Sequence, residues 1–181
     1  MVNILILKEV LEMLKPFKYV FFSGMAMEVY TNGKRKAKDF DIIVDKEDIE
    51  EFAKLINCKL DYRKIVKEDY HSEDYGGVVD YKGQEIELTS GFPKKRVEDA
   101  TIKKLFERRK KVNYLGLNIY VVPIEETIAF KALMHREKDY IDLEMLKEIE
   151  FDINLVKEYA RDWGQEEKAI KILKEAGFIK I

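Results

Sequence analysis

Two carboxylates, Asp39 and Asp41, stand one residue apart at the start of an apolar run, residues 42–44. Side chains alternate between the two faces of a strand, so a strand here places both carboxylates on one face and Phe40 on the other. Two rigidly held carboxylates are typical ligands of Mg²⁺, which takes further oxygens from substrate phosphates. Asp-x-Asp is also common on solvated edges and turns. The pair is therefore a candidate Mg²⁺ or Mn²⁺ site that needs support from its surroundings.

That support comes from a strand, a turn and a helix upstream. Residues 19–22 are aromatic or β-branched and predict a buried strand, and a helix is expected from Gly24 to about Tyr30. Ser23 and Gly24 form the turn between them. At such a turn, backbone N–H groups and a hydroxyl can approach phosphate closely, and the helix N-terminus favours negative charge. Ser23 and Gly24 are therefore candidate phosphate-binding residues.

A basic loop, residues 34–38, leads from this helix to the first carboxylate. Its charge has the sign required beside a phosphate, and Arg35 is our candidate there. An exposed basic loop without such a role is the more common situation. The loop thus supports a phosphate site without establishing one.

Glu87 is the candidate for a third acid. It lies between Ile86 and Leu88 on a predicted strand, where an unpaired charge is costly unless it meets a cation. A third carboxylate near the first pair suits two-metal phosphoryl or nucleotidyl chemistry. Glu85 shares its face and is the alternative, and an ordinary exposed hairpin face explains both residues equally well.

The remaining elements follow from periodicity and turn signals. Residues 78–81 and 84–88 are expected to form a hairpin, residues 117–122 a strand, and Pro123 is expected to begin a helix that carries Lys131. Further helices are expected at residues 5–14, 46–57, 140–149, 154–163 and 166–176. The pattern predicts an α/β fold with a mixed sheet flanked by helices. Residues 1–122 would form its core and residues 123–181 a C-terminal helical region packed on that core, or the whole chain a single domain.

Composition limits the class of protein. The 181 residues are 46% hydrophobic, enough for a full core, and 33 basic residues balance 35 acidic ones, so no global field recruits nucleic acid or lipid. The single cysteine, Cys58, excludes an internal disulfide and fits a reducing cytoplasm. No apolar run reaches the roughly 18 residues of a membrane span. Glutamine occurs only at Gln84 and Gln165, a bias associated with hyperthermophiles. We expect a cytoplasmic protein without membrane association.

A second basic run, residues 108–111, follows a predicted helix. A solvated face is the preferred interpretation, and the run is assigned no role. The tyrosines and phenylalanines do not interleave with a basic stripe along the chain. They are therefore interpreted as packing residues and not as a platform on which bases stack.

Together these motifs carry a family resemblance. Three of them occur in order: Ser23-Gly24, Asp39-Phe40-Asp41 and Ile86-Glu87-Leu88. In this order they resemble the nucleotidyltransferase superfamily related to DNA polymerase beta. Three more follow: Val122-Pro123-Ile124-Glu125-Glu126, Lys131-Ala132-Leu133 and Arg136-Glu137-Lys138-Asp139-Tyr140-Ile141-Asp142. These look like the helical region of minimal nucleotidyltransferases similar to abortive-infection toxins and lincosamide-modifying enzymes.

The resemblance implies a role for each motif residue. It places Ser23 and Gly24 at a triphosphate, Asp39 and Asp41 on the metal, and Glu87 as the third acid and a further candidate metal ligand. Lys131 either approaches phosphate or occupies a solvated helix position, the latter being preferred. Arg136, Asp139 and Asp142 are at spacings that suit a structural ion-pair network. Two features depart from the family, because Ser23-Gly24 replaces a glycine pair and Glu87 replaces the more frequent aspartate.

The implied reaction is the transfer of a nucleoside monophosphate from ATP or another nucleoside triphosphate to a hydroxyl group, with release of pyrophosphate. The acceptor is a small molecule, a protein or RNA, and the sequence does not distinguish them. The alternative is a catalytically weak nucleotide-binding or partner-binding module that regulates a toxin-antitoxin system. The presence of all three acids favours the enzyme, because a pure binding module has little use for clustered like charges.

Overall fold

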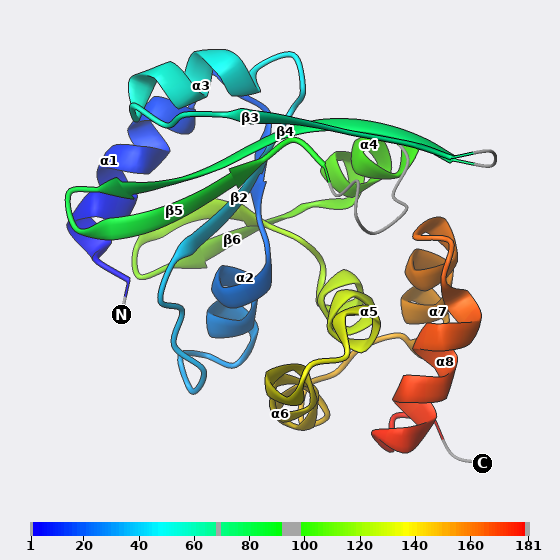
Figure 1. Ribbon diagram of the computed structural model, residues 1–181. Coiled ribbons are helices and arrows are strands. Elements are labelled where there is room, and N and C mark those ends of the chain that lie inside the picture. Colours follow the sequence, from blue (N-terminus) through cyan, green and yellow to red (C-terminus); the bar gives the residue numbers. More distant parts are fainter. Residues whose placement is uncertain (1, 68–69, 92–98, 180–181) are drawn as a thin grey trace.

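The computed structural model describes residues 2–67, 70–91 and 99–179 (Figure 1). Its helices are α1 Ile4–Leu14, α2 Ser23–Tyr30, α3 Ile49–Leu55, α4 Asp99–Arg108, α5 Ile124–Met134, α6 Glu137–Leu146, α7 Ile153–Asp162 and α8 Glu166–Glu175. Its strands are β1 Tyr19–Phe21, β2 Phe40–Val44, β3 Asp61–Lys67, β4 Tyr70–Tyr81, β5 Gln84–Thr89, β6 Lys110–Tyr114 and β7 Leu117–Val121. The described strands form a seven-stranded sheet in the order β3-β4-β5-β2-β1-β7-β6. The predicted α/β class is confirmed.

The sheet is mixed, as expected. β2 runs parallel to β5 and β1 runs parallel to β7, while the other neighbouring strands are antiparallel. β2 occupies the middle of the order. In the β2–β5 register Asp41 lies opposite Glu87. The topology therefore brings two of the predicted acids together from positions far apart in the sequence.

Helices cover the sheet on both faces. Phe40, Ile42 and Val44 point into the core formed with α1 and α3. Ile43, which alternates with these residues along β2, and Val20 in β1 point into a second core formed with α4, α5, α7 and α8. Figure 1 shows α3 and α5 on opposite sides of the sheet. Because Asp41 alternates with Phe40 and Ile42, it projects on the side of α5.

The predicted hairpin is longer than expected but is joined by the expected turn. Tyr81 pairs with Gln84 across Lys82 and Gly83, which both have positive φ, at 55° and 82°. A two-residue loop with positive φ at both positions matches the right-handed twist of the flanking strands. The turn thereby fixes the register of β5, and with it the face that carries Glu87.

The interpretation of the basic run at residues 108–111 as a solvated face holds for Lys110 and Lys111, which are exposed, but not for Arg108. Arg108 ends α4 and is mostly buried, whereas Lys110 and Lys111 open the edge strand β6, which the sequence analysis did not predict. Edge strands tolerate lysines because one side of the strand meets water. The strand was therefore missed in the sequence, because its two lysines are typical of a solvated loop.

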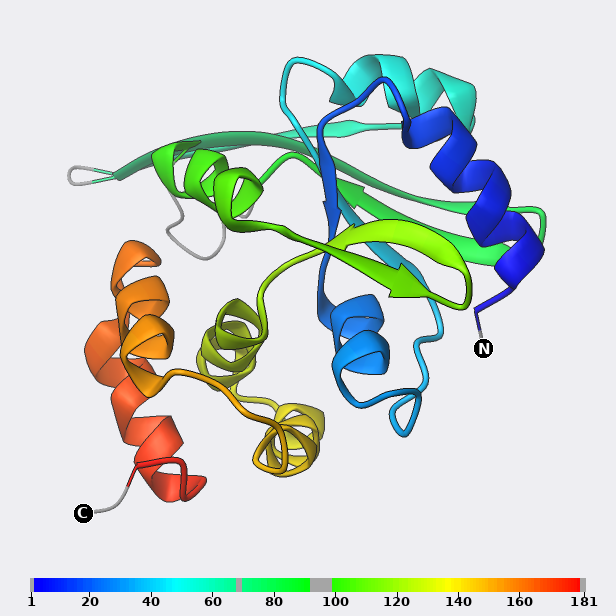
Figure 2. The ribbon, with the colours of Figure 1, turned by 180° about the vertical axis from the view of Figure 1, so that it is seen from behind.

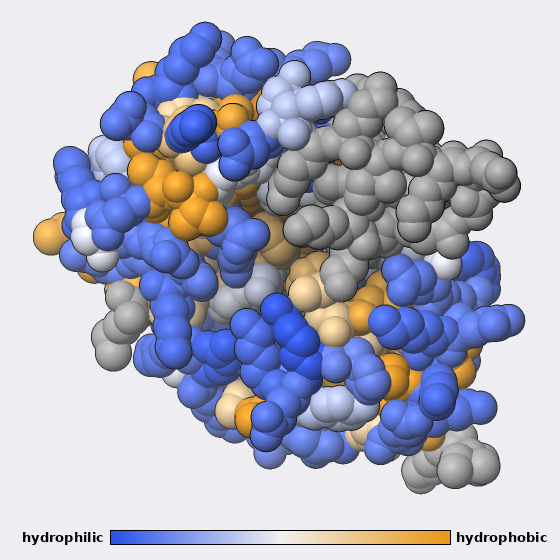
Figure 3. All heavy atoms as spheres, viewed as in Figure 1, coloured by the Kyte–Doolittle hydropathy of each residue, from blue (hydrophilic) through white to orange (hydrophobic). Residues whose placement is uncertain are grey.

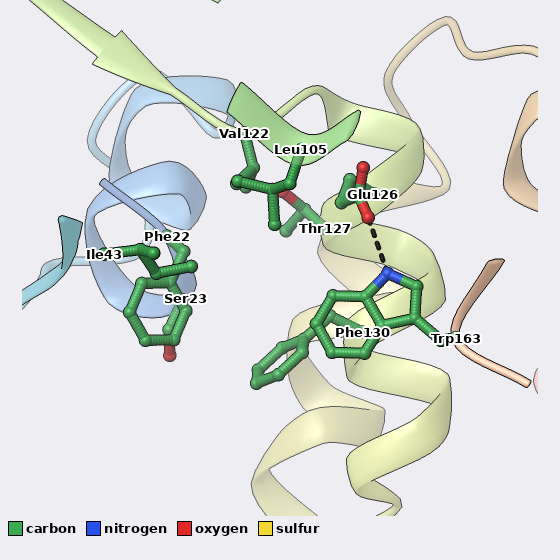
Figure 4. A pocket seen from close by; sticks show the side chains of 9 residues that line it. All are labelled: Phe22, Ser23, Ile43, Leu105, Val122, Glu126, Thr127, Phe130 and Trp163. Carbon is green, nitrogen blue, oxygen red and sulfur yellow. Dashed lines mark hydrogen bonds between the residues drawn. The ribbon is translucent and has the colours of Figure 1, made fainter. Parts of the chain in front are cut away.

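A buried carboxylate joins three of the helices. Glu126 in α5 is 1% exposed and accepts hydrogen bonds from Arg108 Nε at 2.7 Å and from Trp163 Nε1 at 2.6 Å. Figure 4 shows the indole pointing at this carboxylate within a small, mainly apolar pocket that Ser23 also lines. The contacts join α4, the end of α7 and α5, and α5 in turn packs against α2. This packing fixes α5 relative to β2.

None of the described helices combines the length and the apolar character that a bilayer crossing requires. Hydrophilic side chains also cover most of the face shown in Figure 3, with small apolar patches between them.

Candidate active site

One pocket collects every site residue selected from the sequence. It is lined by Ser23, Gly24, Arg35, Lys38, Asp39, Asp41, Glu87, Lys131, Arg136 and Lys138. These residues come from the start of α2, the loop before β2, β2 itself, β5, α5, the α5–α6 connection and the first turn of α6. Acidic and basic side chains thus meet at one end of the central strands.

The two aspartates lie against the same glycine. The Gly24 N–H donates a hydrogen bond of 3.2 Å to Asp41 Oδ2. A Cβ atom added to Gly24 would lie 3.4 Å from Asp39 Oδ1 and 3.7 Å from Asp41 Oδ2. Both carboxylates therefore lie on one side, although Asp39 immediately precedes β2 and only Asp41 belongs to the strand, and a side chain at residue 24 would crowd them.

The turn at Ser23 differs in detail from the expectation. Ser23 adopts a left-handed backbone with φ 50°, which is strained for a residue that has a side chain. Its side chain hydrogen-bonds to Asp41, which also accepts the Gly24 N–H. The turn therefore orients the metal-candidate carboxylate through both residues, and the Gly24 N–H is already engaged by Asp41.

The electrostatics of Asp41 reflect its burial and its neighbours. Asp41 is 6% exposed. Burial, followed by the charges of Asp39 and Glu87, raises the pKa of Asp41 to about 6, against the hydrogen bonds from Gly24 and Ser23 that lower it. At neutral pH three carboxylates repel one another here. A divalent cation would relieve that repulsion.

The donor set fits a cation held jointly with a substrate. Across the described ranges, no three His, Cys, Asp or Glu side chains are grouped tightly enough to hold a metal ion. Magnesium does not require such a cage, since it is usually bound by one or two carboxylates together with phosphates. Asp39 and Asp41 supply that pair of hard oxygen ligands.

The structure separates the two candidates for the third acid. Both glutamates are exposed on β5, but Glu87 lies opposite Asp41 in the parallel register and lines the pocket. Glu85 lies opposite Asp80 in the β4–β5 hairpin and is not among the residues that line the pocket. The geometry favours Glu87.

The basic side of the pocket is built on ion pairs, and the preferred interpretation of Lys131 as a solvated residue is wrong. Lys131 is 1% exposed, and its Nζ lies 2.7 Å from Asp142 Oδ2 and 3.3 Å from Asp139 Oδ1. The Asp142 contact lacks the alignment of a hydrogen bond. Arg35 Nε donates to Asp142 at 2.9 Å, and Arg136 Nε donates to Asp139 at 2.7 Å. The predicted pairing of Arg136 with Asp139 is present, whereas Asp142 pairs with Lys131 and Arg35. The three cations of this network exceed its two carboxylates.

Sequence reasoning missed part of the lining. Lys38, Arg136 and Lys138 also line the pocket. Lys38 belongs to the basic loop, so its signal was present. Arg136 and Lys138 belong to a motif that carries the family resemblance, but the sequence did not place either residue at the pocket.

Glu28 was also missed, and it ties down the loop that carries Arg35. This buried carboxylate accepts from the Ala37 N–H at 2.7 Å, from Tyr114 Oη at 2.8 Å and from Lys36 Nζ at 3.2 Å. A lone charge within the otherwise apolar α2 sequence was the available signal. Glu28 thereby links α2, the loop before β2 and the edge strand β6.

Comparisons with known proteins agree with this architecture. No protein-family model matches the sequence, and no curated protein matches it significantly. A candidate nucleotidyltransferase from Thermotoga maritima is similar in structure, with a TM-score of 0.52, 19% identity, and coverage of 80% of this chain and 92% of the other. An antigenic nucleotidyltransferase-like protein from Paracoccidioides brasiliensis gives a TM-score of 0.50 at 14% identity, covering 94% of this chain and 83% of the other. The chain has the nucleotidyltransferase fold.

Proposed function

We propose that this protein is a metal-dependent nucleotidyltransferase. It would take the nucleoside monophosphate from a nucleoside triphosphate, join it to a hydroxyl group of an acceptor, and release pyrophosphate. The observation that carries the proposal is the placement of Asp39 and Asp41 against Gly24, within a pocket whose other wall is cationic. A metal–triphosphate complex carries both the positive and the negative groups that such a pocket complements.

Each side of the pocket has a distinct task. Asp39 and Asp41 would hold Mg²⁺ or Mn²⁺, which when bound stabilises charge on the phosphate oxygens and on the attacking oxygen. Arg35 and Lys131 would stabilise the charge that develops on the departing pyrophosphate. Because Lys131 is fixed by two aspartates, its positive charge needs little reorganisation during the reaction.

Glu87 is assigned to the acceptor. As an exposed carboxylate opposite Asp41, it would accept the proton of the acceptor hydroxyl as a general base, or orient that oxygen for attack. The acceptor oxygen then forms a bond to the α-phosphorus, and the bond between that phosphorus and the pyrophosphate oxygen breaks. The proton leaves to Glu87 and the electron pair leaves with pyrophosphate.

The test is transfer of label from each α-labelled nucleoside triphosphate, with Mg²⁺ or Mn²⁺, with and without cell extract. The wild type should label an acceptor and Asp41→Asn should not. Glu87→Gln should reduce transfer by about a hundredfold or more, the usual contribution of a general base. Glu85→Gln is the matched control, since Glu85 lies two residues away on the same strand, and it should retain wild-type transfer.

Two results would contradict the proposal. Undiminished transfer by Asp41→Asn would remove the metal assignment. Triphosphate binding without pyrophosphate release would identify a nucleotide-binding regulatory module of the toxin-antitoxin kind instead of an enzyme.

A further inference from the structure

A second groove lies between α1 and the β6–β7 hairpin, which Figure 2 shows side by side. It is lined by Lys8, Leu11, Glu12, Lys15, Phe17, Tyr19, Arg109, Lys111, Gly116, Leu117, Asn118 and Tyr120. It encloses about 510 Å³, within the range of roughly 300–1,000 Å³ usual for ligand sites. No residue is shared with the lining of the candidate active site.

The groove is positively charged, although the chain as a whole has a slightly negative net charge. Lys8, Lys15, Arg109 and Lys111 supply four cations, whereas the protein as a whole has a formal net charge of −2. Glu12 is the single acidic residue in the lining, and it is paired with Lys15. The local field therefore favours an anionic ligand.

The same groove contains a guanidinium stacked on an aromatic ring. The Arg109 guanidinium lies over the Tyr120 ring at 4.2 Å and donates a 2.9 Å hydrogen bond to the Tyr19 carbonyl oxygen, which holds it in place. Tyr19 packs edge-on to Tyr120 at 5.7 Å. Burial raises the pKa of Tyr19 to about 12, so its phenol adds no negative charge. The interpretation of the aromatic residues as packing residues holds for Tyr19, which is 6% exposed. The fold nevertheless brings cations and rings together here that are separate in the sequence.

The cations are spread out and do not converge on one point. Lys8 and Lys15 are seven residues apart on α1, roughly 10 Å along the helix axis. Lys111 is contributed by β6 and not by α1. Such spacing suits a ligand with several anionic groups along its length, and the Arg109–Tyr120 stack suits a ligand that also carries planar rings.

We propose that this groove binds a single strand of nucleic acid. Its phosphates would contact the lysines, and a base would stack on the Arg109–Tyr120 pair. This binding is separate from the nucleotide pocket and requires neither a triphosphate nor a divalent cation.

The test uses fluorescence anisotropy with labelled oligouridylate and oligothymidylate of about ten nucleotides, in EDTA and without nucleotide. The variant is Lys8→Glu with Lys111→Glu, two exposed residues whose substitution should not disturb the core. The control is Lys171→Glu with Lys174→Glu on α8, also exposed, which changes the net charge equally. The wild type should bind, the groove variant should lose at least about tenfold in affinity, and the salt slope should fall by about two. The control should bind within about threefold of the wild type, because a distant charge acts only through the screened field.

The RNA and DNA probes show whether the strand's sugar matters, and binding of either supports the proposal. Equal losses in the groove variant and the control would overturn it, as would wild-type binding too weak to detect at low salt. Inorganic polyphosphate of similar length should compete poorly, since it lacks bases, and competition as strong as that of the oligonucleotide would overturn the stacking assignment. None of these outcomes depends on nucleotidyl transfer.

Discussion

The charged form of Asp41 destabilises the folded state as long as no cation is bound. It is buried beside Asp39 and opposite Glu87, and its pKa is raised from 3.8 to about 6. A carboxylate in such a place is retained for what it binds, because a neutral isostere would relieve the repulsion. Residues with shifted pKa values in a cleft are typical of functional sites.

This arrangement predicts an unusual pH dependence of stability. Since the folded pKa exceeds the unfolded one, the folded protein binds the proton more tightly. In EDTA, the contribution of Asp41 is therefore most favourable below about pH 4 and is lost as the pH rises through 6. Asp41→Asn should remove this dependence and raise the free energy of unfolding at pH 8 by up to about 2–3 kcal/mol.

Thermal unfolding of both proteins at pH 5 and pH 8 measures this difference. Mg²⁺ should then stabilise the wild type more than the variant. Indistinguishable pH profiles for the wild type and Asp41→Asn would show that the repulsion at this site is absent.

At the scale of elements, the basic wall of the pocket is shared between the loop before β2, helix α5 and the start of α6. Lys131 is buried between two aspartates, whereas Arg35 reaches Asp142 from the loop before β2 and its side chain is 27% exposed. Loss of the buried cation should therefore affect folding as well as the site, whereas loss of the peripheral one should affect nucleotide binding alone.

Lys131→Met should lower the free energy of unfolding by about 3 kcal/mol, since it leaves buried carboxylates short of a partner. Arg35→Gln should change the free energy of unfolding by less than about 1 kcal/mol, because Asp142 still has Lys131 as an ion-pair partner. Arg35→Gln should instead raise the KM for the triphosphate. Unfolding curves and nucleotide titrations of the two variants separate these effects, and equal destabilisation by both would contradict this division of roles.

The loop before β2 depends on α2 and β6 through Glu28. Glu28→Gln replaces one acceptor oxygen with a donor and should cost about 1–3 kcal/mol. The Ala37 amide, whose hydrogen bond to Glu28 is 2.7 Å, should then exchange faster with solvent. Tyr114→Phe removes only one of the contacts and is the milder control. Hydrogen exchange at Ala37 that is unchanged in Glu28→Gln would show that the loop is held by other contacts.

These elements also show where sequence reasoning succeeds. The strand with Asp41 and the β4–β5 turn were predictable, because period-two alternation and a Lys82-Gly83 turn are local signals. The edge strand β6 was not predictable, because its lysines mimic a solvated run. The burial of Lys131 likewise depends on aspartates from α6, so its own helix carries no sign of it.

At the scale of the whole molecule, the mixed sheet converts distant motifs into one pocket. The parallel pairing of β2 and β5 places Glu87 opposite Asp41, and the packing of α5 on α2 brings Lys131 to the same place. Motif order and family resemblance predicted which residues would meet. They did not predict Lys138 in the pocket or the cationic groove beside α1, because both depend on tertiary packing.

The most direct test of the central claim follows the two ends of the triphosphate separately. Purified protein is incubated with Mg²⁺, acceptor-containing extract, and the same nucleoside triphosphate labelled on either the α- or the γ-phosphate. A nucleotidyltransferase should transfer the α-label to the acceptor and release the γ-label as pyrophosphate, with neither event in Asp41→Asn. Transfer of the γ-label to the acceptor, or α-label transfer that survives in Asp41→Asn, would contradict the account.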